Sequence, residues 1–413
     1  MIEIAVAGPG LMGLGIAQIA AAAGCRVHLI GRDAGAALRG RDRLAQQLER
    51  EVTRGRLEAG AVNALLQRVV PADDDRTLAH CVLAIEAVPE ARAVKEAVLQ
   101  RLQSALPASA WIATNTSGLP ISGLARALRD PSRLVGLHFF SPVPRMKLVE
   151  VVRGDATPEA TLRSALGFVE RLGQVPIVVR DAPGFFTSRV FAAYLDEALA
   201  MLAEGVDPTL IEQVAVDEVG RAIGPLAVLD DISLELNWQQ IRQARADGLP
   251  PERCRPDGAP VLEAMVARGR GGRRQGGGFY DNAVDGRRRP WPALAELFPL
   301  RPVQPAASEV ALRLRCAEAM EALRCLEHGV ISSADDADTG SLLGLGYQPS
   351  SGGVLSWVEK RGLADTVSTC EALARAHGER FRPSAWLRAL CDGSHGLRRY
   401  RAAPLDNPEG AGS

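Results

Sequence analysis

The chain lacks net charge, a long apolar run and any paired-cysteine motif, and each absence narrows its class. Its 48 basic residues are balanced by 49 acidic ones, which leaves a formal net charge of -1 over 413 residues. This balance gives no reason to expect nucleic acid or an anionic membrane as a partner. The sequence contains no run of about 20 apolar residues, so we expect no membrane span. A globular protein of about two or three domains is the class that remains.

Cysteine and lysine are both scarce. The cysteines number seven, an odd count, and none forms a C-x-x-C pair, which argues against a disulfide framework and against a zinc site. From this cysteine pattern we expect reduced thiols, no bound metal and a cytoplasmic location. Because the sequence opens directly on a strand pattern, we expect no signal peptide. Lysine occurs only at Lys95, Lys147 and Lys360, and we interpret the excess of arginine as coding bias.

A Gly-rich stretch near the N-terminus is the most informative motif that is present. It reads GPGLMGLGIA, follows the apolar run Ile2–Ala7 and precedes the small-residue run Ile16–Ala23. This strand, turn and helix context makes G-x-G-x-x-G a predicted dinucleotide site. Its first Gly allows a tight turn, its second lets the backbone approach a pyrophosphate, and its third lets the helix pack closely. The helix N-terminus then offers free N–H groups to the phosphates. The residues predicted to bind the cofactor here are Gly8, Gly10, Leu11, Met12 and Gly13.

The first part of the chain, residues 1–181, alternates short apolar runs with helical patterns. Such alternation predicts a Rossmann-type, parallel, doubly wound α/β sheet that binds NAD(P). The predicted strands are Ile2–Ala7, Arg26–Ile30, Val82–Ala87, Trp111–Thr114, Leu134–His138 and Val175–Val179. The predicted helices include Leu11–Ala23, Ala36–Arg54 and Ala61–Arg68. The turn Asp181–Gly184 is expected to close this domain.

The rest of the chain reads as helical and contains a repeat. Residues 196–225 align without a gap to residues 320–349, at an offset of 124, and Glu197 matches Glu321 while Gly205 matches Gly329. We interpret this as a duplicated all-α domain, with one copy in residues 182–290 and the second in residues 306–400. Each copy can bury its apolar face against the other, so we expect a monomer, with a homodimer as the alternative.

Three polar residues stand at places where catalysis is expected. Ser117 follows one predicted strand and His138 ends another, and in a doubly wound sheet ligands bind beyond the carboxyl ends of the strands. Glu150 lies in an apolar stretch, where a buried carboxylate needs a partner, and His138 is the natural one. A histidine held by a carboxylate suits the removal of a hydroxyl proton while hydride leaves the carbon. The alternatives are a hydrogen-bonded core histidine and a turn-capping serine.

Taken together, these segments resemble the (S)-3-hydroxyacyl-CoA dehydrogenases of fatty-acid β-oxidation. The resembling segments, in chain order, are Gly8–Gln18, Glu86–Glu90 with Lys95, Ala113–Ile121, Gly136–Glu150, Asp181–Arg189 and Gly269–Asp281. The doubled helical region is similar to stand-alone bacterial dehydrogenases and to the dehydrogenase part of multifunctional β-oxidation enzymes. The resemblance implies hydride transfer at C3 of an acyl-CoA substrate, with Ser117 holding the substrate oxygen, His138 as base and Glu150 orienting it. It also implies that Glu90, Lys95 and Asn115 lie along the cofactor.

The sequence departs from the family pattern at two serines. Ser188 stands where most members place an active-site Asn, and Ser141 replaces an Asn found in many members. Both replacements have precedents in the family. Ser188 could hydrogen-bond Ser117 or the substrate, although a serine reaches less far than an amide.

A third departure concerns the choice of cofactor. The family's Asp at the end of the second strand falls on Gly31, and Arg32 follows it. Loss of the carboxylate and gain of a guanidinium favour a 2′-phosphate, hence NADP(H) over NAD(H). Asp33 offers the alternative, because a local shift could let it take the usual role on the ribose. With NADPH, the working direction would be reduction of a 3-oxoacyl-CoA.

Two other functions stay open at this point. One is a dehydrogenase of the same fold that acts on a free hydroxy acid. The other is a cofactor-binding homologue without turnover, for which the departures at Ser188 and Gly31 are the only support. The acyl group could also be tethered to a carrier protein instead of CoA.

Overall fold

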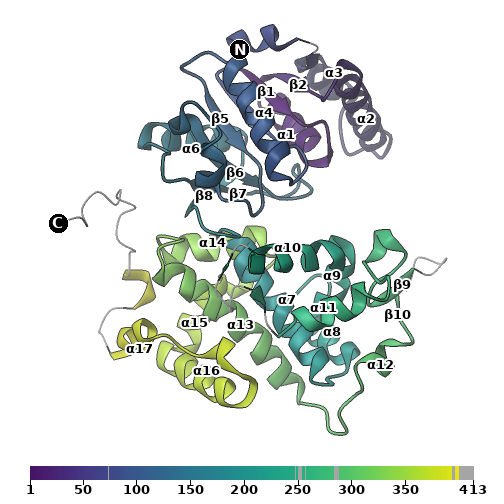
Figure 1. Cartoon of the computed structure of the whole chain (residues 1–413), viewed down its shortest axis with the longest axis vertical. Coiled ribbons are helices and arrows are strands. Elements are labelled where there is room, and N and C mark those ends of the chain that lie inside the picture. Colours follow the sequence, from purple (N-terminus) through teal and green to yellow (C-terminus); the bar gives the residue numbers. More distant parts are fainter. Residues whose placement is uncertain are drawn as a thin grey trace. The chain divides into compact units, whose positions relative to one another are not determined.

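The computed structural model describes residues 1–72, 74–246, 248–249, 254–255, 257–282, 288–392 and 396–399. They form two compact units (Figure 1). The first unit holds Met1–Phe186 together with Gly329–Ser332, and the second holds Thr187–His328 and the described residues from Ser333 onward. In these described residues, no helix combines the length and the apolar character needed to cross a bilayer.

The first unit is built on an eight-stranded sheet with the order β3-β2-β1-β4-β5-β6-β7-β8. Its strands are β1 Glu3–Ala7, β2 Arg26–Ile30, β3 Val69–Ala72, β4 Leu83–Glu86, β5 Trp111–Thr114, β6 Leu134–Phe139, β7 Leu148–Arg153 and β8 Val175–Arg180. The strands from β3 to β6 in this order pair in parallel. Strand β7 pairs antiparallel with β6, and β8 then pairs in parallel with β7.

The predicted fold class is confirmed, and the six predicted strands are all present. The prediction of a wholly parallel sheet is wrong for β7 and β8, which run opposite to the rest. The reason lies in the connection of residues 140–147 between β6 and β7. It is shorter than the dozen or so residues that a parallel crossover needs, so the chain turns back beside β6.

Helices cover both faces of this sheet. They are α1 Leu11–Ala22, α2 Ala34–Thr53, α3 Ala59–Arg68, α4 Arg92–Ala105, α5 Ile121–Ala125 and α6 Glu159–Arg171. Residues of α1, α2, α3 and α6 share one apolar core with the strands. Helix α4 packs on β4 and β5, and α5 packs on β6, but their buried leucines lie outside that core. Helices on both faces are what a doubly wound sheet requires.

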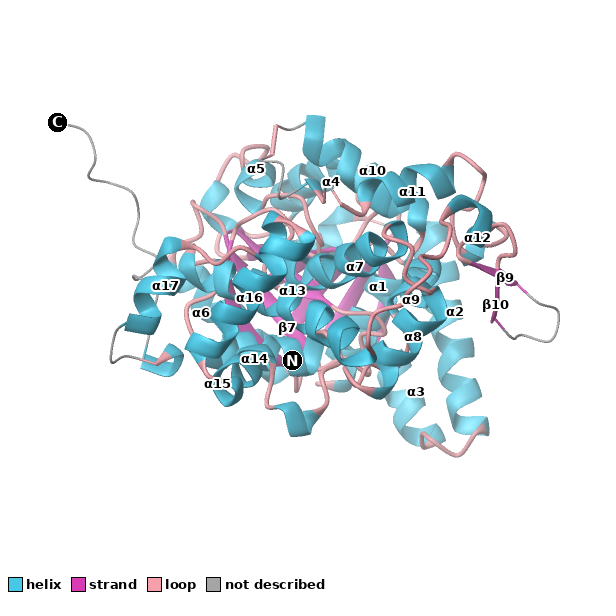
Figure 2. Ribbon diagram, turned by 90° about the horizontal axis from the view of Figure 1, so that it is seen from below, coloured by secondary structure: helices cyan, strands magenta, loops and turns pink. Residues whose placement is uncertain are grey.

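The second unit is almost entirely helical (Figure 2). Its first copy comprises α7 Thr187–Ala203, α8 Pro208–Asp217, α9 Pro225–Ile232, α10 Leu234–Ala246 and α11 Ala259–Val266. Its second copy comprises α13 Ala307–Glu327, α14 Ala334–Gly344, α15 Val354–Arg361, α16 Leu363–His377 and α17 Ala385–Asp392. A small strand pair, β9 Tyr280–Asn282 and β10 Arg288–Pro290, and the short helix α12 Leu294–Leu297 lie between them in the chain. The division of the helical region into two repeated domains, 182–290 and 306–400, stays a prediction.

Two matching ion pairs join the copies through α7 and α13. Arg189 of α7 bonds Glu321 of α13 at 2.7 Å, and Arg313 of α13 bonds Glu197 of α7 at 2.6 Å. Each residue of the first pair is offset by 124 from its counterpart in the second, so this is one interaction made twice. The pairing is that of two antiparallel helices side by side.

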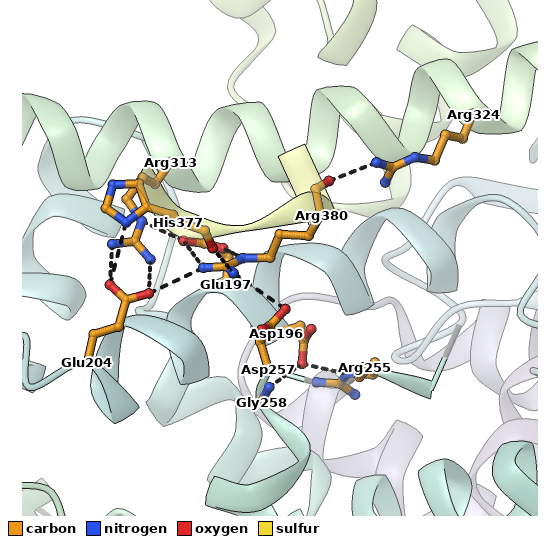
Figure 3. Close-up of polar contacts among 10 residues, drawn as sticks. All are labelled: Asp196, Glu197, Glu204, Arg255, Asp257, Gly258, Arg313, Arg324, His377 and Arg380. Atoms are coloured by element: carbon orange, nitrogen blue, oxygen red, sulfur yellow. Dashed lines mark hydrogen bonds and ion pairs between the residues drawn. The ribbon is translucent and has the colours of Figure 1, made fainter. Parts of the chain in front are cut away.

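The second of these pairs belongs to a larger buried network (Figure 3). Both Arg313 and Glu197 are fully buried, and Arg313 also forms a two-bond contact with Glu204 at 2.6 and 2.8 Å. Arg380 adds a bond to Glu197 at 2.5 Å and an ion pair with Asp257 at 3.4 Å. Burial alone would raise the pKa of the Glu204 carboxyl, but its hydrogen bond with Arg313 holds that pKa below the usual value. Glu204 is therefore held ionised by an arginine from the other copy.

Candidate active site

The Gly-rich loop has the geometry of a phosphate site. Gly8 adopts φ +108°, and a Cβ there would lie 2.4 Å from the carbonyl oxygen of Ala87. A Cβ at Gly13 would lie 1.9 Å from the carbonyl oxygen of Gly8, so helix α1 can begin here only without side chains at both positions. Gly10, by contrast, would meet nothing within 4 Å. It is the N-cap of α1 and supplies no side-chain cap, which leaves the first N–H groups of the helix to a bound anion.

The end of β2 has no room for an aspartate at the family's usual position. A Cβ at Gly31 would lie 2.7 Å from the backbone nitrogen of Ala37, in the first turn of α2. The carboxylate of Asp33 is instead the N-cap of α2 and accepts the Ala36 N–H at 2.7 Å, a bond that lowers the pKa of Asp33. Arg32 lies beside it, with Nε 3.3 Å from the Asp33 carboxylate and a side chain that is 85% exposed. Arg39 lies 3.8 Å from the same carboxylate.

A buried ion pair supports the loop that follows β4. Lys95 of α4 is 1% exposed and lies 2.9 Å from the carboxylate of Glu86, which is fully buried at the end of β4. Thr114, at the end of β5, donates its hydroxyl to Glu86 at 2.5 Å. Lys95 also contacts Glu90 at 3.2 Å. Glu86 was not among the predicted site residues, although it too is a carboxylate in an apolar stretch, the signal that singled out Glu150.

Glu90 in turn holds the loop that carries Ser117. It accepts the Thr116 hydroxyl at 2.5 Å and the Ser117 backbone N–H at 3.1 Å. Burial would raise the pKa of the Glu90 carboxyl, but the charge of Lys95 and these hydrogen bonds hold it below its usual value. On the other side of the loop, the Asn115 side-chain oxygen accepts the Phe139 N–H at 2.9 Å. Glu90, Lys95 and Ser117 are therefore joined by polar contacts, and Asn115 bonds the same loop to the end of β6.

His138 and Glu150 form a buried pair. They face each other directly across the antiparallel register of β6 and β7, and Nδ1 of His138 lies 2.7 Å from Oε2 of Glu150. Glu150 is fully buried and His138 is 8% exposed. Because Nδ1 faces the carboxylate, Nε2 is the ring nitrogen available for exchanging a proton. The antiparallel strand that the sequence did not reveal is thus what aligns the predicted pair.

Ser141 and Ser188, the two serines that depart from the family pattern, lie in different parts of the structure. Ser141 precedes Pro142 in the loop after β6, close in sequence to His138. Ser188 lies in the first turn of α7, in the second unit, so its contact with Ser117 or substrate stays a prediction.

Fold and loop together define a dinucleotide-binding protein of the Rossmann class. Residues 3–182 match the NAD binding domain of 3-hydroxyacyl-CoA dehydrogenase, and residues 184–282 match its C-terminal domain. The chain therefore belongs to the 3-hydroxyacyl-CoA dehydrogenase family.

Solved structures agree with this assignment. The 3-hydroxybutyryl-CoA dehydrogenase from Escherichia coli K12 is 28% identical, with a TM-score of 0.81, and the match covers 94% of this chain and 98% of that one. The (S)-3-hydroxybutyryl-CoA dehydrogenase PaaH1 from Ralstonia eutropha is 31% identical, with a TM-score of 0.64 over 68% of this chain and 98% of its own. The dehydrogenase part of multifunctional enzyme 1 from C. elegans, 24% identical, shares the fold over 94% of this chain and 89% of that chain, with a TM-score of 0.66. A match over 94% of the chain includes both helical copies.

Proposed function

We propose that this chain catalyses reversible hydride transfer between C3 of an (S)-3-hydroxyacyl-CoA and a nicotinamide cofactor, with His138 as the general base. The observation that carries the proposal is the buried His138–Glu150 pair, with 2.7 Å between Nδ1 and Oε2, at the carboxyl end of β6. The Escherichia coli and Ralstonia relatives, which are 3-hydroxybutyryl-CoA dehydrogenases, support the acyl-CoA substrate.

Ser117, His138 and Glu150 each have a defined task in the oxidation. The Ser117 hydroxyl and His138 Nε2 hold the substrate hydroxyl, and Nε2 takes its proton. The Glu150 carboxylate stabilises the resulting imidazolium and fixes the ring, because it accepts a hydrogen bond from Nδ1. The bound nicotinamide supplies the hydride acceptor for C3. In the reverse direction, protonated His138 returns the proton to the oxygen of a 3-oxoacyl group.

The substrate class is tested by comparing acetoacetyl-CoA with free acetoacetate as oxidants of NADH and NADPH. We expect turnover with the thioester and at most about a hundredth of its kcat/KM with the free acid, since binding energy from the CoA part is lost. Equal turnover of the two would favour the alternative dehydrogenase of a free hydroxy acid. Cofactor binding without turnover of either, or of longer acyl-CoAs, would favour the non-catalytic homologue.

We further propose that the cofactor is NADP(H) in preference to NAD(H). The support is the end of β2, where Gly31 removes the usual acid, Asp33 serves as the N-cap of α2, and the exposed Arg32 and Arg39 flank it. An arginine pair beside a helix N-terminus suits a 2′-phosphate, because guanidinium groups bind phosphate through paired hydrogen bonds. The matching domain of the family is an NAD binding domain, so a preference for NADP(H) would be this chain's own departure.

Removal of the two arginines tests the cofactor proposal. Arg32→Ala combined with Arg39→Ala is expected to raise KM for NADPH by about 100-fold or more, because two charge-assisted bonds of roughly 1.5–3 kcal/mol each are lost, while KM for NADH changes less than about threefold. Arg163→Ala, an exposed arginine on α6, is the matched control and should alter neither constant. If wild type prefers NADH and Asp33→Asn weakens NADH binding, Asp33 holds the ribose and the preference for NADP(H) is wrong.

We also propose that the chain is a monomer whose second helical copy takes the place of a partner. In the second copy, the turn Gly329–Ser332 bonds the edge strand β8, where the Arg180 N–H donates to the Val330 carbonyl at 2.8 Å. In the first copy, the equivalent turn at Gly205 is already bonded by the segment between α12 and α13, because the Arg301 N–H donates to the Gly205 carbonyl at 2.9 Å. The sheet edge of a second subunit would have to displace that segment.

Sedimentation equilibrium at micromolar concentration checks this proposal. The expected mass is that of one chain, 43.9 kDa, at all concentrations. A mass of two chains that persists on dilution would show that the duplicated copy does not replace a partner, and the homodimer alternative would then hold.

A further inference from the structure

We propose that the segment Asp181–Phe186, which links the sheet of the first unit to helix α7, is a positioning element for the catalytic residues. The inference rests on the proposed function and adds to it a set of residues with no direct contact to the reacting atoms. Its three contacts reach the Ser117 loop, Glu150 and His138, all within the first unit.

The first contact fixes the end of the Ser117 loop. The two carboxylate oxygens of Asp181 accept the N–H groups of Ile121 at 2.9 Å and of Ser122 at 2.7 Å. These are the first N–H groups of helix α5, which begins at Ile121 and directly follows the loop that carries Ser117. Carboxylates bond helix N-termini strongly, so Asp181 holds the start of α5 in place. Glu90 holds the other side of the same loop through the Ser117 N–H.

The second contact fixes the carboxylate that orients the base. The Phe186 N–H donates to Oε1 of Glu150 at 3.1 Å, while Oε2 of the same carboxylate faces His138. Phe186 is fully buried, so this bond forms away from water. With one oxygen held by a backbone group, Glu150 can present the other to the imidazole in a single orientation.

The third contact fixes the imidazole itself. The Phe185 ring lies 5.9 Å from the His138 ring and the Phe140 ring lies 4.5 Å from it. Phe185 is fully buried and has φ +49°, a left-handed conformation that is rare for a bulky residue. Such outliers persist only where the surroundings demand them, and here the turn delivers both the ring to His138 and the next N–H to Glu150. The segment therefore ties the proton acceptor, its carboxylate and the substrate-binding loop to one piece of backbone.

Two substitutions test this role through a separation of kcat from KM. We expect Phe185→Leu to lower kcat by about 10- to 100-fold with acetoacetyl-CoA, because small misplacements of catalytic groups have effects of this size. Asp181→Asn, which replaces one accepting oxygen by a donor, should lower kcat by about tenfold. KM for substrate and cofactor should change less than about threefold in both, because neither residue binds them directly. The matched control for the aspartate is Asp130→Asn, which makes the same change in a similar N-terminal cap, on the Ser132 N–H, and should leave kcat unchanged.

A double-mutant cycle separates positioning from a merely structural role. If Phe185 acts through the His138–Glu150 pair, Phe185→Leu should lower kcat little further once Glu150→Gln is present. The proposal would be overturned if the losses of kcat in the two single variants of the cycle multiply in the double variant. It would also be overturned if kcat stays near wild type in both Phe185→Leu and Asp181→Asn. Should Phe185→Leu fail to fold, Phe185→Gly replaces it, because glycine adopts the positive φ freely and still removes the ring. If wild type shows no turnover, or if His138→Gln is fully active, the proposed function itself fails. If wild type and His138→Gln behave as proposed and only the Phe185 and Asp181 variants keep their kcat, the positioning role of the segment Asp181–Phe186 alone fails.

Discussion

His138→Gln is expected to lower kcat for reduction of acetoacetyl-CoA by about 10³-fold, within the range that general acid–base groups contribute. Glutamine preserves a side chain of similar length with hydrogen-bonding capacity but has no titrating group to give or take the proton. Glu150→Gln should lower kcat less, by about 10²-fold, because the imidazole remains and loses only the carboxylate at Nδ1, 2.7 Å away. KM for the cofactor should stay within about threefold of wild type in both variants, since neither residue lies in the Gly-rich loop.

The chain contains its own control for this experiment. His28 in β2 is also buried and also faces a carboxylate, with Nε2 2.8 Å from Glu3. Like His138, His28 is paired with a glutamate, but it lies within β2, away from the strand ends where ligands bind. His28→Gln should therefore leave kcat within about twofold, while costing stability of the same order as His138→Gln. Equal losses of kcat in both variants would mean that His138 acts through folding and not as the base.

Arg313→Met should produce the largest loss of stability, about 3–5 kcal/mol in the free energy of unfolding. Arg313 is fully buried, and methionine fills much of its volume without charge. Among the described residues, the substitution leaves the fully buried Glu197 with Arg380 as its ionic partner, and it leaves Glu204 without its two-bond contact. A buried carboxylate that loses one of its partners is costly because water cannot replace the lost bonds. Chemical denaturation followed by circular dichroism gives the measurement.

A second substitution shows whether charge or packing causes the loss. Adding Glu197→Gln to Arg313→Met should restore at least about 1 kcal/mol, because the buried charge that was left without Arg313 is then gone. Arg163→Met on the surface of α6 is the control and should change the free energy of unfolding by less than about 0.5 kcal/mol. A loss below about 1 kcal/mol in Arg313→Met would show that the ion pairs contribute little to holding the two helical copies together.

The sequence predicted the sheet, the Gly-rich loop and the repeat because each depends on local pattern. The glycines that follow strand β1 have a fixed spacing, and the repeat places Glu197 and Glu321 at corresponding positions, 124 residues apart. His138 and Glu150 could be paired in advance, since a carboxylate in an apolar stretch requires a partner. Their strand alignment could not, because the antiparallel return of β7 depends on loop length and not on composition.

The contacts of the segment Asp181–Phe186 could not be predicted from local sequence pattern. Phe186 bonds Glu150 through its backbone N–H, 36 residues away, and Asp181 bonds Ile121 across 60 residues. A backbone N–H is common to every residue except proline, so it leaves no mark in the sequence. Glu86 differs, because it ends an apolar strand as a lone carboxylate, and that signal was available.

The central claim is most directly tested by the initial rate at which wild type oxidises NADPH and NADH with acetoacetyl-CoA, followed by absorbance at 340 nm. The account predicts turnover by wild type, faster with NADPH at low cofactor concentration, and a rate about 10³-fold lower for His138→Gln measured in parallel. Turnover by wild type that His138→Gln matches would contradict the assignment of the base. Absence of turnover with acetoacetyl-CoA and with longer 3-oxoacyl-CoAs, despite measurable cofactor binding, would contradict the dehydrogenase function itself.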